Sequence, residues 1–160
     1  MEQSEIIRSI REKISNDVLG YHAYKGDDTL IVKREAIFRI MKILKEEFHF
    51  EMLVDICAVD FLGQSPRFEV VYHLNSLSRK MRLRVKVPLE EGQEVESLVP
   101  VWPIANWLER ETWDMMGITF TNHPDLRRLI MYEGFVGHAL RKDYPINRRQ
   151  PLIKPKHEYR

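Results

Sequence analysis

Acidic and basic side chains that could form ion pairs are concentrated between residues 109 and 128. Glu109 and Glu111 flank Arg110. Residues two apart on a helix point to different faces, so these carboxylates are poorly placed to act as an acid–base pair. Each can instead hold a separate arginine, such as Arg127 or Arg128, through bidentate hydrogen bonds. Two interpretations stay open: these acids attach the C-terminal segment to its own domain, or they contact another subunit.

Two histidines, His123 and His138, are the other candidates for chemistry, because together with a nearby acid they could bind a metal ion. They lie 15 residues apart, and neither belongs to a closely spaced pair such as His-x-x-x-His, so the metal-binding pattern is weak. A hydrogen-bonded histidine within an interface is the favoured interpretation. A free-standing metal-dependent enzyme that uses both histidines is the alternative.

Several common catalytic patterns are absent from the sequence. It contains no glycine loop for a dinucleotide or a phosphate and no Gly-x-Ser-x-Gly nucleophile motif. Its single cysteine, Cys57, can form no internal disulfide and cannot supply the thiolates of an iron–sulfur cluster. Because Cys57 lies in an apolar run that is typical of a buried strand, we expect a packed thiol and not a nucleophile.

The net charge of +1 conceals an uneven distribution along the 160 residues. Residues 1–126 hold 16 Lys and Arg against 21 Asp and Glu, whereas residues 127–160 hold nine against three. A basic segment after an acidic domain indicates contact with a negative surface, and a solvated terminus fits the charge equally well. Nucleic acid is a disfavoured partner, because the isoelectric point is near 7.9 and no reader motif accompanies Arg148, Arg149, Lys154, Lys156 and Arg160.

The spacing of apolar residues predicts the elements that must position these side chains. Helical spacing predicts helices at about 4–15, 37–48 and 104–116, the last with Pro103 in its first turn and Gly117 just past its end. β-rich or alternating runs predict strands at about 18–24, 29–33, 53–59, 68–74 and 81–87. This order indicates a two-layer α+β fold with a mostly antiparallel mixed sheet and helices on one face.

The last predicted helix leads into a segment of different character. We expect Trp107, Leu108 and Met115 on its inner face, and a surface ion pair between Arg110 and Asp114. Residues 118–160 show little periodicity, and their large apolar residues and basic charge favour a segment that folds onto a partner. We therefore predict an α+β domain at 1–117 and an extended basic docking arm at 118–160.

The sequence also bears on the compartment. The longest stretch without Lys, Arg, Asp or Glu, residues 97–108, is too short to span a bilayer. The N-terminus is charged from its second residue and lacks an apolar signal segment. We therefore expect a cytoplasmic location with no direct membrane span.

Two blocks of the sequence are more specific than these general patterns. The first is Glu-Arg-Glu-Thr-Trp-Asp-Met-Met-Gly-Ile-Thr-Phe at 109–120, followed by His123-Pro124 and Leu126-Arg127-Arg128-Leu129-Ile130. It closely resembles a motif of the C-subunit family of respiratory complex I, which is also called NADH-quinone oxidoreductase. The second, Gly137-His138-Ala139-Leu140-Arg141-Lys142-Asp143-Tyr144-Pro145, is similar to another segment typical of that family. Asn122 and Ala139 depart from the pattern, because Gly and Pro are more common at these positions.

The resemblance implies a small non-redox subunit in the peripheral arm of proton-translocating NADH:quinone oxidoreductase, on the cytoplasmic side of the cell membrane. Such a protein has no cofactor of its own, while FMN, iron–sulfur clusters and quinone belong to the assembled complex. Its partners would be the quinone-site subunit and cluster-bearing neighbours, which it would hold in position. An equivalent subunit of a related membrane-bound hydrogenase or other complex I-like enzyme is the closest alternative.

The resemblance places the partner contacts in the same two blocks, and it implies no catalytic, cofactor-binding or metal-binding residue on this chain. Glu109, Glu111 and Asp114 would anchor the arm or a partner through arginine. The complete set of expected contact residues is Glu109, Arg110, Glu111, Asp114, His123, Arg127, Arg128, Gly137, His138, Arg141, Lys142, Asp143, Tyr144 and Pro145.

Overall fold

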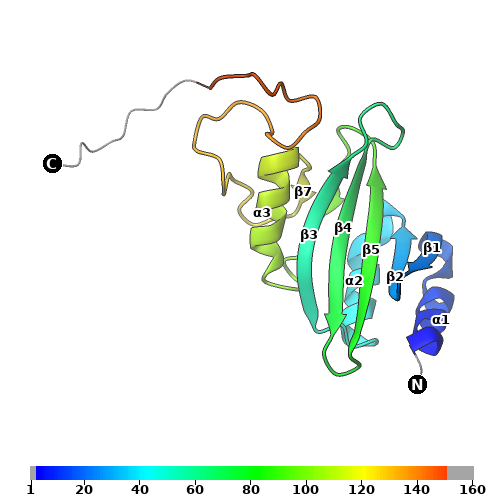
Figure 1. The fold of residues 1–160 in the computed structure, drawn as a ribbon. Coiled ribbons are helices and arrows are strands. Elements are labelled where there is room, and N and C mark those ends of the chain that lie inside the picture. Colours follow the sequence, from blue (N-terminus) through cyan, green and yellow to red (C-terminus); the bar gives the residue numbers. More distant parts are fainter. Residues whose placement is uncertain (1–2, 151–160) are drawn as a thin grey trace.

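The computed structural model describes residues 3–150, which form a five-stranded sheet with helices packed against it (Figure 1). The strands are β1 (Val18–Tyr24), β2 (Asp27–Val32), β3 (Met52–Asp60), β4 (Phe68–Ser76) and β5 (Met81–Leu89), in the order β1-β2-β5-β4-β3. Neighbouring strands are antiparallel except β2 and β5, which are parallel. The predicted α+β class with a mostly antiparallel mixed sheet is confirmed.

The core lies between one face of the sheet and the helices α1 (Gln3–Lys13) and α2 (Ile37–Glu46). The spacing of the buried residues places them on one face of α2: Ile37, Ile40, Met41 and Leu44. Alternate residues of the strands meet them, among them the fully buried Tyr72 of β4. Burial of each large apolar side chain stabilises the fold by about 1.5 to 3 kcal/mol. Two 3-10 turns, η1 (Ser15–Asp17) and η2 (Arg34–Ala36), lead into β1 and α2.

A third helix, α3 (Ala105–Met116), packs beside β3 at the edge of the sheet. The hydroxyl of Thr112 donates to the carbonyl of Ile56 and so occupies part of that strand edge. Two short strands, β6 (Val95–Glu96) and β7 (Phe120–Thr121), pair in parallel; neither was predicted from the sequence. Ile118 and Phe120 lie in the core, and no helix or strand follows from residue 122 to residue 150.

Two expectations about packing are wrong. The strand β3 is not buried on both faces, because Val54, Cys57 and Val59 point to the open side of the sheet and are exposed. Cys57 is therefore an exposed thiol and not a packed one. Trp107 is exposed as well, because the inner face of α3 follows another line of residues, which includes Leu108 and Met115. Within residues 3–150, no helix combines the length and the apolar character that crossing a membrane requires.

Candidate protein-docking site

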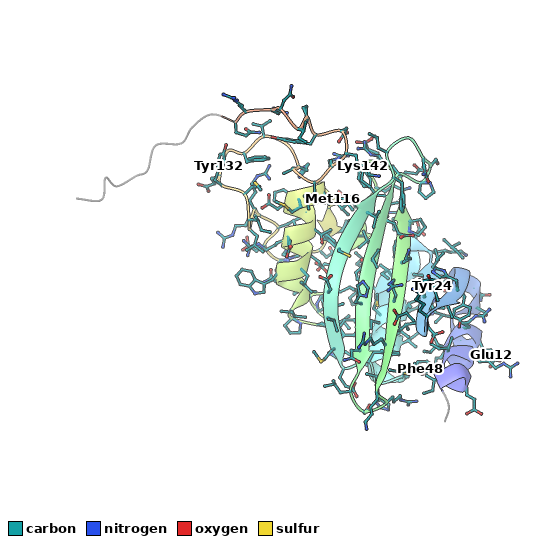
Figure 2. The ribbon with its side chains drawn as sticks, viewed as in Figure 1. Glu12, Tyr24, Phe48, Met116, Tyr132 and Lys142 are labelled. Atoms are coloured by element: carbon teal, nitrogen blue, oxygen red, sulfur yellow. The ribbon has the colours of Figure 1, made fainter. Side chains whose placement is uncertain are left out.

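The predicted site residues gather where residues 122–150, here named the crossing segment, pass over the C-terminal half of α3. Figure 2 shows Tyr132 and Lys142 on this segment, beyond the end of α3 at Met116. Because the crossing segment has no regular secondary structure, its backbone N–H and C=O groups need partners from elsewhere. Polar side chains from the α+β layers provide several of those partners.

Asp114 of α3 is the centre of the first polar cluster, and its side chain is fully buried. Its Oδ2 accepts hydrogen bonds from the N–H groups of Leu129, Ile130 and Met131 at 3.0, 2.8 and 2.8 Å. Its Oδ1 accepts one from Nη1 of Arg128 at 2.5 Å. Burial alone would raise the pKa of Asp114, but the N–H groups and the guanidinium together hold that pKa below its ordinary value. The charged carboxylate thus fixes the backbone of the crossing segment.

Arg128 carries this anchoring further along the crossing segment. Its Nη2 donates to the carbonyls of Phe135 and Gly137 at 2.8 and 3.1 Å. Its guanidinium carbon also lies 5.7 Å from the ring centre of Trp113, a cation–π distance. A single arginine therefore connects α3 to two turns of the crossing segment, which would otherwise have unsatisfied carbonyl groups.

Arg110 binds the crossing segment from the preceding turn of α3. Its Nε and Nη2 donate to the carbonyls of Arg127 and Arg128, both at 3.1 Å. The predicted surface pair of Arg110 with Asp114 is wrong, because both residues are buried and turn toward the crossing segment. The side chain of Arg127 is exposed and pairs with Asp125 at 2.9 Å.

The acids Glu109 and Glu111 do not bind the Arg127-Arg128 pair. Glu109 faces the core, where its oxygens accept hydrogen bonds from the hydroxyl of Ser97 and the N–H of Leu98, both at 2.6 Å. Burial raises the pKa of Glu109 to about 7, and these two hydrogen bonds oppose the shift only in part. The side chain of Glu111 is exposed and forms no hydrogen bond or ion pair with the described part of the chain.

His123 lies beside Glu109 at the start of the crossing segment. Its Nδ1 accepts the N–H of Asp125 at 3.0 Å, so in the neutral ring Nε2 carries the proton. Nε2 donates to the carbonyl of Asn106 at 3.2 Å and lies 3.9 Å from Oε2 of Glu109. The preceding Asn122 has a φ of 61°, a left-handed conformation that glycine and asparagine tolerate best.

His138 fixes the crossing segment at the end of α3. Its Nδ1 lies 3.0 Å from the carbonyl of Asp114, and its ring covers Gly117. A Cβ at position 117 would come within 2.5 Å of Cδ2 of His138, and Gly117 has a φ of 77°, so both space and backbone require glycine. Neither His123 nor His138 belongs to a group of three metal-ligating side chains within residues 3–150.

A further cluster, which no sequence pattern indicated, attaches the crossing segment to the ends of β3 and β4. Nε and Nη2 of Arg67 donate to the two carboxylate oxygens of Asp60 at 3.0 and 3.1 Å. Glu91 and Asp143 also lie against this guanidinium, at 2.8 and 2.9 Å. The N–H of Lys142 donates to Asp60 at 2.8 Å, so the crossing segment is bound through both backbone and side chain.

Arg141 completes the Arg67 cluster through an ion pair with Glu91 at 2.5 Å. The hydrogen bond from Arg67 is the largest influence on Asp60, and it lowers the pKa of that carboxyl. The signal that could have revealed this cluster is the hairpin register: Asp60 pairs with Phe68 across β3 and β4, which brings Arg67 beside Asp60. Periodicity alone does not provide that register.

The rest of the second block packs within the crossing segment or faces outward. The ring of Tyr144 stacks on Phe135 with centres 5.8 Å apart and lies against Gly137, where a Cβ would come within 3.0 Å of it.

Pro145 is exposed, and so are five large hydrophobic side chains: Ile130, Tyr132, Val136, Leu140 and Ile146. Lys142, Arg148 and Arg149 are exposed too, while Lys154, Lys156 and Arg160 lie outside the described residues. Several exposed apolar residues on one segment, with basic neighbours, are typical of a protein-binding surface.

Comparisons with known proteins agree with the resemblance seen in the sequence. Residues 30–150 match the family described as the respiratory-chain NADH dehydrogenase 30 Kd subunit. The C subunit of NADH-quinone oxidoreductase from Geotalea uraniireducens is 47% identical over 146 residues, which cover 91% of this chain and 89% of that protein. The protein of the same name from Geobacter metallireducens is 48% identical over 147 residues, which cover 91% of each chain.

A solved structure shares the fold. It is a chain of the membrane-bound sulfane sulfur reductase, an archaeal respiratory membrane complex, with a TM-score of 0.72, 20% identity and 98% coverage of both chains. At this identity the similarity shows the fold alone. The family match, in contrast, includes α3 and the whole crossing segment. Its relatives are C subunits of NADH-quinone oxidoreductase. The chain therefore belongs to the respiratory-chain NADH dehydrogenase 30 Kd subunit family.

Proposed function

We propose that this chain is a non-redox structural subunit of a proton-translocating NADH:quinone oxidoreductase. It holds the quinone-site subunit and cluster-bearing subunits in position in the peripheral arm, on the cytoplasmic side of the membrane. FMN, iron–sulfur clusters and quinone then belong to the other subunits. Family membership supports the enzyme, and the single cysteine supports the absence of a cluster here, because such clusters are held by several thiolates.

The observation that carries this proposal is that the polar side chains which bind the backbone of the crossing segment lie beneath it, while five of its large apolar side chains face outward. Asp114, Arg110, Arg128 and His138 bind backbone groups of this chain, so they shape a surface instead of supporting a reaction. The apolar side chains that they hold in place point outward, where an adjacent protein of the complex can bury them. A displacement of about 1 Å between reacting groups can lower a rate by about a factor of 100, so such positioning has functional value.

The contact residues divide into two groups under this proposal. Four exposed members, Glu111, Arg127, Lys142 and Pro145, contact partner subunits directly, whereas the exposed Asp143 binds Arg67 of its own chain. The buried and half-buried members position the surface that the partner binds. This division assigns a partner role to Glu111, which has no partner within the described residues.

Replacement of one exposed apolar residue tests the proposal. Leu140 is 63% exposed, so Leu140→Asp should not disturb the fold of the chain. Inside an interface, however, the new carboxylate would be buried without a partner, and each 1.4 kcal/mol of such a cost lowers affinity about tenfold. We expect at least about a tenfold loss of assembled complex in membranes, while NADH:quinone turnover per assembled complex stays unchanged.

The matched control is Leu19→Asp, at a position on β1 that is 55% exposed and lies outside the crossing segment. This variant should assemble normally. Normal assembly of Leu140→Asp together with lost turnover per complex would contradict the structural role.

A further inference from the structure

A second surface of the molecule is left open by the fold. α1 and α2 pack on one face of the sheet, and within residues 3–150 neither a helix nor the crossing segment covers the other face of β3, β4 and β5 (Figure 1). Asp55, His73 and Arg84 form one row across this open face, in register on the three strands. Cys57, Val71 and Lys86 form the next row.

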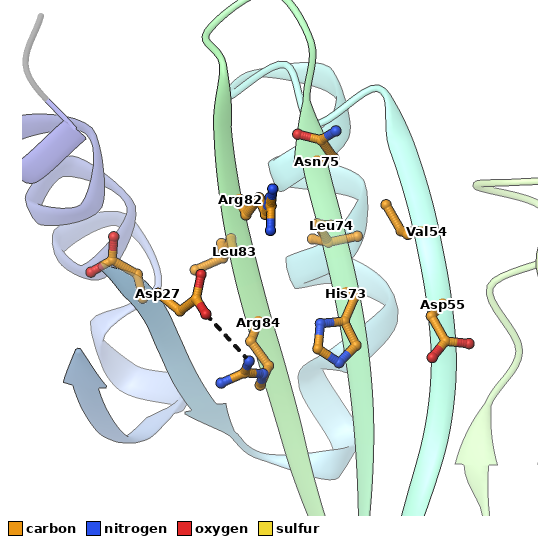
Figure 3. A pocket seen from close by; sticks show the side chains of 10 residues that line it. Asp27, Val54, Asp55, His73, Leu74, Asn75, Arg82, Leu83 and Arg84 are labelled. Atoms are coloured by element: carbon orange, nitrogen blue, oxygen red, sulfur yellow. Dashed lines mark ion pairs between the residues drawn. The ribbon is translucent and has the colours of Figure 1, made fainter. Parts of the chain in front are cut away.

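The open face is hollowed toward its β4–β5 hairpin end (Figure 3). The hollow has a volume of about 530 Å³, and its walls include Val54 and Asp55 from β3, His73 and Asn75 from β4, and Arg82 and Arg84 from β5. It lies along an open sheet surface and not inside the fold. That shape suits a loop or strand of another protein, which can follow the direction of the strands.

Charges on the open face are paired over most of its length. Arg84 lies 3.8 Å from Asp27 (dashed line in Figure 3), and Lys86 lies 2.7 Å from Glu69. These pairs leave little charge for a partner along the central part of the face. Asp55 remains beside His73, its neighbour across the strand ladder.

The hairpin end differs, because the carboxylate there, Glu51, accepts hydrogen bonds from the N–H of Leu77 and the hydroxyl of Ser78, and the basic side chains form no ion pair with the described residues. Arg79, Lys80 and Arg82 have no carboxylate within ion-pair distance among the described residues. Two exposed apolar side chains, Val54 of β3 and Leu77 of the hairpin, lie at the same end of the sheet. Unpaired cations next to exposed apolar groups favour a partner with carboxylates and apolar side chains over a basic one, which the cations would repel.

We propose that the open face at the β4–β5 hairpin end is a second docking surface, which takes an acidic, partly apolar loop or strand of a neighbouring subunit. Carboxylates of that partner pair with Arg79, Lys80 and Arg82, and its apolar side chains cover Val54. This surface is separate from the crossing segment, so the proposal goes beyond the function proposed above and is tested independently of it.

The single cysteine of the chain reports directly on the open face. Cys57 is exposed there, one row from the hollow, and a maleimide reacts with it only where reagent can reach the thiol. We would measure the rate at which Cys57 is labelled at pH 8 in the isolated chain and in the native complex. A covered face predicts at least about a tenfold slower reaction in the complex. Equal rates would overturn the proposal.

A charge reversal tests the chemistry of the partner. Arg82→Glu should lower the amount of assembled complex about tenfold or restore labelling of Cys57 within the complex, because its carboxylate repels those of the partner. Arg8→Glu on the exposed side of α1 is the control, and it should have neither effect. An unchanged labelling rate in the isolated Arg82→Glu chain verifies its fold. If Arg82→Glu matches the control while Leu140→Asp still blocks assembly, this proposal fails and the structural role stands.

Discussion

At the scale of single residues, two buried carboxyl groups of α3 have pKa values shifted in opposite directions. Both Asp114 and Glu109 have no exposed side-chain surface. Asp114 has four hydrogen-bond donors, one of them the charged Arg128, and its pKa is lowered. Glu109 has two neutral donors, and burial raises its pKa to about 7. The depth of burial, together with the number and charge of the donors, thus decides the direction in which the pKa moves.

The raised pKa of Glu109 predicts a pH-dependent stability. Its pKa is about 7 in the folded chain against 4.5 without the fold, so its contribution is fully present below pH 4.5 and is lost as pH rises through 7. The loss amounts to roughly 3 to 4 kcal/mol of unfolding free energy. Glu109→Gln stays neutral, so this slope should disappear and the variant should be the more stable chain above pH 7. Urea unfolding of both chains between pH 5 and 8 measures the effect.

Two neighbouring titratable groups, His123 and Tyr72, are present in both chains, so the comparison measures the carboxyl of Glu109 together with its contact to His123. The pKa of Tyr72 is raised by burial and by the charge of Glu109, so this phenol stays protonated between pH 5 and 8. Glu111→Gln, at an exposed position on the same helix, is the control and should keep the wild-type slope. Identical pH slopes in wild type and Glu109→Gln would show that Glu109 stays ionised in the folded chain.

At the scale of elements, Arg67 shows how burial sets the energy of an ion pair. Asp60 at the end of β3 and Asp143 of the crossing segment bind the same guanidinium at similar distances. The side chain of Asp60 is 1% exposed and that of Asp143 is 46% exposed. Water screens the second pair and not the first. The two contacts therefore join the same elements with very different strength.

Paired substitutions test this difference. Asp60→Asn removes the buried carboxylate that binds Arg67 and leaves only the exposed Glu91 and Asp143 against the guanidinium, so it should cost about 3 kcal/mol of unfolding free energy. Asp143→Asn should cost less than about 1 kcal/mol, because its pair is half exposed. Unfolding of both variants in urea at pH 7 provides the comparison. Equal losses would mean that the arginine moves to compensate, and that burial does not determine the strength of this cluster.

At the scale of the whole molecule, periodicity predicted the layers but not the connections between them. The helices and long strands were predictable because their apolar residues repeat with the period of the element. The two-residue strands β6 and β7 were not, because two residues are too few to show a period. The exposure of Val54 and Cys57 was missed for a related reason: β-forming residues on the open face look the same in sequence as buried ones.

The sequence predicted the type of contact in the candidate site better than it predicted the residues that make that contact. The sequence indicated that acids and arginines near α3 could attach the C-terminal segment to its own domain, and such an attachment exists. It named three acids as anchors, and of these Asp114 binds Arg128 of the crossing segment, whereas Glu109 and Glu111 do not, because the rotation of α3 on the sheet decides which residues face that segment. The Arg67 cluster joins residues up to 83 positions apart, from Asp60 to Asp143, and no local pattern reports such a contact.

The structure as a whole predicts that different mutations can alter the shape of the crossing segment and its docking to a partner subunit. Asp114→Asn preserves size but removes the charge facing Arg128, and its amide donor group opposes N–H donors of the crossing segment. We expect a loss of about 3 kcal/mol in unfolding free energy, faster amide exchange at residues 129–131, and less assembled complex. Leu140→Asp should reduce the amount of assembled complex and leave unfolding free energy and amide exchange unchanged.

Asp125→Asn, which breaks only the exposed pair with Arg127, should change none of these measurements. Unaltered exchange at 129–131 in Asp114→Asn would mean that the crossing segment keeps its shape without this carboxylate, and that its outward surface does not depend on α3.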